Sequence, residues 1–128
     1  MTVAVLITVE KLTATLCVAR NGVIGAVIYN RFIKEGWDIA ARKQAVTCAD
    51  LVRHIARVCD IAGDTLHAGI GSDFDGGYGV ESTPTEIDTV SDLQKLGDAL
   101  SDTQFNDDAI ANILGMNWVR LLQRVLPQ

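Results

Sequence analysis

The feature that most constrains the fold is an uninterrupted apolar run from Val23 to Tyr29. Apolar and polar residues do not alternate in it, as they would in a strand with one face in water, so we expect a strand covered on both faces. Such strands are typical of parallel sheets. A second short strand is expected over residues 67–72. With 128 residues, 48% of them hydrophobic, the chain can bury the core of one domain but not of two.

Between these two strands the sequence predicts an amphipathic helix. Thr47 followed by Asp50 resembles a capping box, with Asp in place of the usual Glu or Gln, and Gly63 is a typical helix stop. The apolar residues in between recur at helical spacing: Leu51, Val52, Ile55, Val58, Cys59 and Ala62. A strand, a helix and a further strand form a parallel crossover unit, so we expect an α/β fold.

The other segments give weaker signals. They are an apolar strand-like run over residues 3–9, a short helix over residues 11–20, a helix after Pro84 with apolar residues up to Leu100, a helix over residues 106–114 that Gly115 should end, and an amphipathic helix from Trp118 to Pro127. We find no repeat and no linker in the sequence.

Charge and length exclude several classes of function. Eleven Lys and Arg against sixteen Asp and Glu give a net charge of −5 without a basic block, so a nucleic-acid partner is not expected. The apolar run over residues 2–9 is too short for a bilayer, which needs about 20 residues, and it lacks the flanks of a signal peptide. We therefore expect a soluble cytoplasmic protein without a membrane partner.

The three cysteines favour a reducing compartment. They are Cys17, Cys48 and Cys59, an odd number without paired spacing. On one helix, Cys48 and Cys59 would lie roughly 16 Å apart, too far for a disulfide.

The residues that could form a functional site are concentrated in the acidic, glycine-rich loop over residues 69–79. Asp73 and Asp75 directly follow a buried strand, and the ends of such strands are where α/β folds build their sites. A carboxylate held there suits a metal ligand or a general base. The same pattern is equally typical of a plain Asx/Gly turn, so both interpretations stay open on the residues alone.

Spacing excludes other sites. Tyr78 and Pro84 stand where a calcium loop needs a glycine and an acid, and Phe74 stands where a dinucleotide fingerprint needs a glycine. His54 and His67 are expected to be structural, and neither forms a zinc-site spacing with the cysteines.

Four segments resemble one family in the correct order. The run from Leu66 to Gly77 resembles the last barrel strand of the membrane (renal-type) dipeptidases, which are zinc peptidases of the amidohydrolase superfamily. Residues 23–30 are similar to the seventh strand of that family, and residues 50–62 to the helix that follows it. Gly115, Asn117 and Arg120 resemble its C-terminal Gly-x-Asn-x-x-Arg signature. The resemblance covers residues 22–126.

The resemblance implies a (β/α)8 barrel with two zinc ions that hydrolyses dipeptides by metal-activated water. Asp73 matches the carboxylate that shuttles a proton in the family, and is the expected catalytic residue. The residues expected to shape the rim or to face the substrate are Tyr29, Asn30, Asp75, Gly76 and Gly77.

One departure is large: the chain contains no His-x-Asp pair, and its two histidines do not match family ligands. We therefore expect residues 22–128 to be the C-terminal portion of the barrel, its last two βα units plus C-terminal helices, with residues 1–21 unassigned. By this interpretation the chain alone binds no zinc and is inactive. The alternatives are an interaction module or split-barrel half that pairs through exposed sheet edges with its own or another chain, and a small α/β domain without present function.

Overall fold

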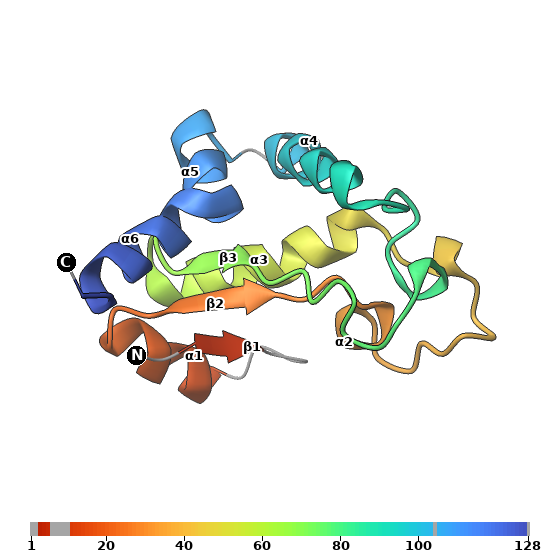
Figure 1. Cartoon of the computed structure of the whole chain (residues 1–128), viewed down its shortest axis with the longest axis horizontal. Helices are drawn as coiled ribbons and strands as arrows, with labels where there is room; N and C mark the ends of the chain where they lie inside the picture. Colours follow the sequence, from red (N-terminus) through yellow and green to blue (C-terminus); the bar gives the residue numbers. More distant parts are fainter. Residues whose placement is uncertain (1–2, 6–10, 104, 128) are drawn as a thin grey trace.

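The computed structural model describes residues 3–5, 11–103 and 105–127, and its centre is a parallel sheet of three strands (Figure 1). The strands are β1 (Val3–Val5), β2 (Val23–Ala26) and β3 (Ala68–Ile70), and they lie in this order across the sheet. The α/β class and the parallel pairing of the two predicted strands are confirmed.

The strands are shorter than the apolar runs that predict them. Pairing ends at Ala26 and at Ile70, although Val27 and Ile28 stay buried. An apolar run therefore marks burial rather than the length of the hydrogen-bonded ladder. Residues 6–9 of the first expected strand lie outside the described residues.

Helices cover the sheet. In Figure 1, α3 runs along the sheet, α4, α5 and α6 lie above it, and α1 lies below β2 next to β1. Their bounds are Lys11–Ala19 for α1, Asn30–Ile33 for α2, Cys48–Ala62 for α3, Lys95–Asp102 for α4, Asp107–Ala111 for α5 and Asn117–Val125 for α6. Short 3-10 turns lie at Lys43–Ala45, Val80–Ser82 and Val90–Gln94.

The helix α3 begins and ends as predicted. The Thr47 hydroxyl accepts the backbone N–H of Asp50, and the Asp50 carboxylate accepts the N–H of Thr47 at 2.9 Å, which completes the capping box. Gly63 ends the helix with φ +77°, a left-handed conformation that glycine adopts without strain.

The core lies between α3 and the sheet. Val52, Ile55 and Val58 project from α3 into one cluster with Ile24 of β2 and Ala68 of β3. A second cluster, beyond the carboxyl ends of the strands, consists of Ile28, Ile33, Trp37, Val46, Cys48, Leu51, Ile87 and Leu96. Together the two clusters hold the strand ends in place.

The prediction of one helix after Pro84 is wrong in its bounds. The segment becomes helical only at Val90, as a 3-10 turn that leads into α4. A second capping box causes this late start, because the N–H of Thr89 donates to the Asp92 carboxylate at 2.9 Å. Val90, expected on the apolar face, is 68% exposed.

The prediction that Gly115 ends a helix is also wrong. Asn112–Met116 form a π-helical turn that joins α5 directly to α6. Glycine weakens a helix but, unlike proline, keeps its N–H donor and creates no clash. The joined helices therefore pass through Gly115.

Two side chains of α6 hydrogen-bond the outer edge of β3. Strand β2 bonds the carbonyl of His67, so the alternating carbonyls of Ala68 and Ile70 face outward. Asn117 Nδ2 donates to Ala68 O at 2.7 Å, and Trp118 Nε1 donates to Ile70 O at 3.0 Å. Two carbonyls of this edge, which was expected to be exposed, therefore have hydrogen-bond partners within the chain.

In the part of the chain that the structure describes, no helix has the length and apolarity needed to cross a membrane.

Candidate active site

The candidate site lies where β2 and β3 end on the same edge of the sheet. Parallel strands bring their carboxyl ends together, and ligands bind there in open α/β sheets. After β3 the chain passes through Gly71 and Ser72 to Asp73, which is exposed. After β2 it reaches Tyr29, which is partly buried. The predicted catalytic residue therefore occupies the expected strand end.

The Asp73 loop has an unusual backbone. Asp73 and Asp75 have φ of +53° and +67°, values that non-glycine residues seldom adopt, and Gly77 has φ +95°. The N–H of Gly76 donates to Asp73 O at 2.9 Å. A Cβ atom at position 76 would collide with the Asp73 carboxylate, so that carboxylate lies folded over Gly76. The position of the Asp73 carboxylate therefore depends on the conformation of the turn at Gly76.

Tyr78 connects the two strand ends. Its hydroxyl donates to Ser72 O at 2.6 Å, directly before Asp73. Its ring stacks on Tyr29 with centroids 4.5 Å apart and an angle of 14°. The Tyr29 ring also meets Phe32 edge-on at 5.0 Å. The structure therefore brings Asp73, Tyr78 and Tyr29 to one place.

The surroundings of Tyr78 shift the pKa of its hydroxyl. Burial raises the pKa of Tyr78 to about 12, and the negative charge of Asp73 and the neighbouring Tyr29 add to the shift. Tyr78 therefore remains a neutral hydrogen-bond donor across the physiological pH range.

Asn30 lies in a different environment from Tyr29. It is 0% exposed, its Nδ2 donates to Thr83 O at 2.9 Å, and its Oδ1 has no hydrogen-bond partner among the described residues. Lys43 Nζ reaches the same segment, donating to Thr83 Oγ1 at 2.9 Å and Val80 O at 3.0 Å and pairing with Asp88 at 2.8 Å. Asn30 thus anchors the segment that follows the loop, and its contact with substrate stays a prediction.

The residues described do not fit a dinuclear metal centre. Within ranges 11–103 and 105–127, no three His, Cys, Asp or Glu side chains converge as ligands would. Both histidines face backbone carbonyls instead, with His54 Nε2 2.8 Å from Ile33 O and His67 Nδ1 2.8 Å from Gly22 O. Both contacts agree with the structural roles predicted for them.

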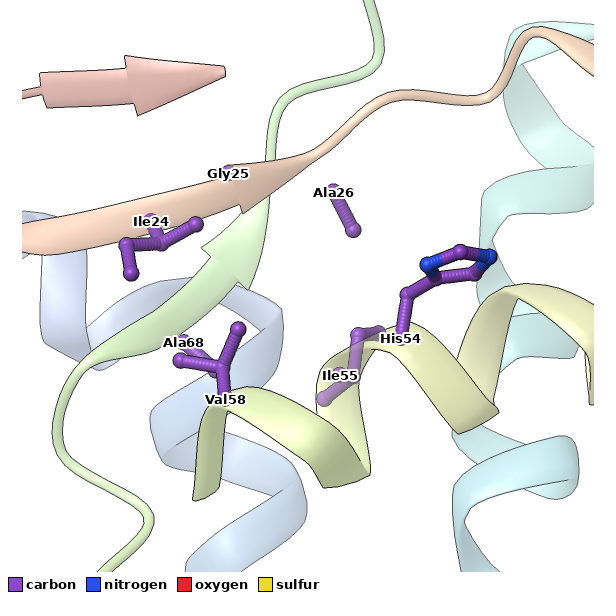
Figure 2. Close-up of a pocket in the computed structure, with 7 residues that line it drawn as sticks. All are labelled: Ile24, Gly25, Ala26, His54, Ile55, Val58 and Ala68. Carbon is purple, nitrogen blue, oxygen red and sulfur yellow. The ribbon is translucent and has the colours of Figure 1, made fainter. Parts of the chain in front are cut away.

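A small pocket lies between α3 and strands β2 and β3 (Figure 2). It has about 20 Å³ of space, enough for about one water molecule. The lining residues come from β2, α3 and β3: Ile24, Gly25, Ala26, His54, Ile55, Val58 and Ala68. This pocket is a packing gap under α3, away from Asp73.

Tyr78 is a site residue that the sequence alone did not indicate. The only local signal is an aromatic residue in a loop of small and acidic residues. Its partner Tyr29 is far away in the sequence, and only the sheet brings the two rings together.

Comparison with known families gives a match over most of the chain. The family model described as "Membrane dipeptidase (Peptidase family M19)" matches residues 11–126. The match begins within the segment over residues 1–21 that the sequence left unassigned.

Individual relatives agree with this match. The chain is 30% identical over 108 residues to a Klebsiella pneumoniae protein described as an uncharacterized protein in the pqqA 5′ region. Among solved structures it is similar to dipeptidase AC, described as a metallopeptidase of family M19, with a TM-score of 0.78 and 24% identity over 95% of this chain. An amidohydrolase from Pseudomonas aeruginosa gives a TM-score of 0.70 at 24% identity over 88%. The chain spans 37%, 37% and 39% of these proteins.

Proposed function

Because the chain belongs to the membrane dipeptidase family, peptidase family M19, we propose that it forms the C-terminal part of a dipeptidase (β/α)8 barrel, in which β1 and α1 precede the last two βα units. In this proposal β2 and β3 are the seventh and eighth barrel strands, and Asp73 is the catalytic residue. The substrate is a dipeptide, and the reaction is hydrolysis of its peptide bond.

The single observation that carries the proposal is the placement of Asp73. An exposed carboxylate follows a buried parallel strand, held by the Gly76 turn. A carboxylate in this position can accept a proton from the attacking water and deliver it to the leaving amine. The peptide carbonyl carbon gains the hydroxyl group, and the amine leaves with the transferred proton.

We also propose that residues 1–128 alone do not hydrolyse dipeptides. The two zinc ions of the family would be held by the parts of the barrel that this chain does not supply. The observation that supports this proposal is that no three His, Cys, Asp or Glu side chains converge in the described ranges.

A chimera tests the proposal. Residues 11–126 would replace the matching segment of a full-length dipeptidase of the family, and dipeptide hydrolysis would be measured with added zinc. We expect activity that falls by about 100-fold or more in Asp73→Asn, because general acid–base groups contribute roughly 10²–10⁴ in rate.

The matched control is Asp60→Asn, which removes an exposed carboxylate in the last turn of α3. It should leave hydrolysis unchanged. A folded chimera without activity, or equal activity in Asp73→Asn, would contradict the proposed role.

A second candidate is that the chain is one half of a split barrel. The observation in its favour is a set of exposed apolar side chains along α6, namely Val119, Leu122 and Val125. Its partner would be a chain that supplies the remaining barrel strands. Light scattering of the purified chain tests its assembly with itself, and co-expression with the complementary part of a family dipeptidase tests the split barrel.

A further inference from the structure

The seven residues from Ser72 to Tyr78 form a closed loop at the end of β3. The Tyr78 hydroxyl reaches back to Ser72 O at 2.6 Å, so the side chain at the end of the loop bonds the backbone at its beginning. Between them, Gly76 N–H bonds Asp73 O at 2.9 Å. The loop thus has an inner turn and an outer closure.

The closure is fixed to the neighbouring strand. The Tyr78 ring is stacked 4.5 Å from Tyr29, which follows β2, and Tyr29 in turn meets Phe32 of α2. The ring that carries the Tyr78 hydroxyl is therefore held in place by Tyr29, a residue outside the loop. A phenol on a mobile loop would give no such restraint.

Asp73 needs this restraint. Its φ of +53° is unfavourable for a residue with a Cβ atom, and such conformations persist where the surroundings enforce them. The only backbone atom between the Tyr78 bond and Asp73 N is the carbonyl carbon of Ser72. Loss of the bond would let this peptide rotate.

We propose that Tyr78 is a positioning residue that fixes the Ser72–Asp73 peptide and thereby aims the Asp73 carboxylate. The inference rests on the proposed role of Asp73 in dipeptide hydrolysis. Tyr78 does not transfer a proton; it acts through the backbone.

The first test uses the purified chain and needs no activity. Tyr78→Phe removes only the hydroxyl and keeps the stacking ring. We expect the Gly76 amide, which bonds Asp73 O, to exchange with deuterium at least roughly tenfold faster in this variant. The Gly63 amide, which bonds Cys59 O at 2.8 Å, serves as the internal control and should keep its rate.

The second test uses the dipeptidase chimera. Tyr78→Phe should lower kcat by about tenfold or more and leave KM unchanged, because misplacing a catalytic group by about 1 Å can cost roughly 100-fold. A purely structural loss would lower the amount of folded enzyme instead, and the melting temperature of the variant measures that.

The two tests separate the two proposals. An inactive wild-type chimera would contradict the proposed function, while faster Gly76 exchange in Tyr78→Phe would still support the positioning geometry. Unchanged Gly76 exchange, or an unchanged kcat in an active chimera, would overturn the role of Tyr78 and leave that of Asp73 intact.

Discussion

The indole Nε1 of Trp118 donates a 3.0 Å hydrogen bond to the carbonyl oxygen of Ile70 on the outer edge of β3. The indole also lies over Gly69, where a Cβ atom would be only 2.5 Å from Nε1. Trp118 of the C-terminal helix therefore contacts both the edge and one face of this strand. An uncovered edge is a site of strand pairing with other chains. In the isolated chain this bond occupies the Ile70 carbonyl, and a further barrel strand that paired with β3 there would have to displace the indole.

Gly69→Ala should destabilise the protein by about 1–3 kcal/mol, because the new methyl group would displace the indole from a packed position. Urea unfolding measures the difference. The matched control is Gly97→Ala in α4, where a Cβ would meet only Leu114 Cδ1 at 3.6 Å. Alanine favours helix there, so the control should gain about 0.5–1 kcal/mol. Equal losses in both variants would contradict the close approach at Gly69.

Trp118→Phe should lower the free energy of unfolding by about 0.5–1.5 kcal/mol, since it removes one hydrogen bond and leaves the Ile70 carbonyl on an open edge. We also expect more self-association, measured by light scattering over a range of concentrations. Trp37→Phe is the control, because it removes an indole donor to Arg42 O away from the sheet. Identical association of both variants would show that the edge contact has no protective effect.

Local signals made part of this fold predictable. Both ends of α3 follow from Thr47, Asp50 and Gly63, whose interactions are all with near neighbours in the sequence. The position of Asp73 beyond a strand end was predictable in the same way, because only Gly71 and Ser72 separate it from β3. Its catalytic role came from the family resemblance and stays a prediction.

Long-range contacts explain what the sequence did not predict. The pairing of β1 with β2 and the stacking of Tyr78 on Tyr29 depend on residues distant in the chain. Asn30 follows β2, where a helical turn begins, and its bond to Thr83 O also joins residues distant in the chain. Its expected contact with substrate stays a prediction.

Thr47→Ala should cost about 1 kcal/mol of stability, because it removes the side-chain half of the capping box of α3. Chemical unfolding measures the loss. The control is Thr15→Ala, which removes an exposed hydroxyl bonded to Lys11 O within α1. Its free energy of unfolding should change by no more than about 0.5 kcal/mol. A similar loss in both variants would mean that the cap does not stabilise α3.

The stability of the protein should fall as pH rises from about 10 to about 12, in part through Tyr78. Its pKa in the folded state is raised to about 12, so the folded protein holds this proton more tightly than the unfolded chain. This contribution is fully present below the unfolded pKa, which is about 10, and is lost as pH rises through the folded pKa. Unfolding experiments on Tyr78→Phe should show a weaker decline over this interval.

The Asp73 carboxylate contributes to that raised pKa through its negative charge. Asp73→Asn should therefore lower the pKa of Tyr78, as measured by the ultraviolet absorbance of the phenolate. Asp60→Asn, on the exposed side of α3, should leave it unchanged. If the pKa of Tyr78 stayed the same in both variants, the Asp73 charge would lie farther from the Tyr78 ring than the structure has it.

Native cysteines should react slowly with thiol reagents at pH 8. Burial raises the pKa of Cys48 to about 12 and that of Cys59 to about 11, and the neighbouring carboxylates Glu86 and Asp64 add to the respective shifts. The thiolate is the reactive form, and a pKa of about 11 leaves only about one thiol in a thousand ionised at pH 8. In urea the same residues should label rapidly, because their pKa returns to about 8.5.

Cys59 is the sharper test, since it is only partly buried. Rapid labelling of native Cys59 would mean that the C-terminal end of α3 opens readily, and hydrogen exchange at the Gly63 amide, bonded to Cys59 O, would then be fast as well.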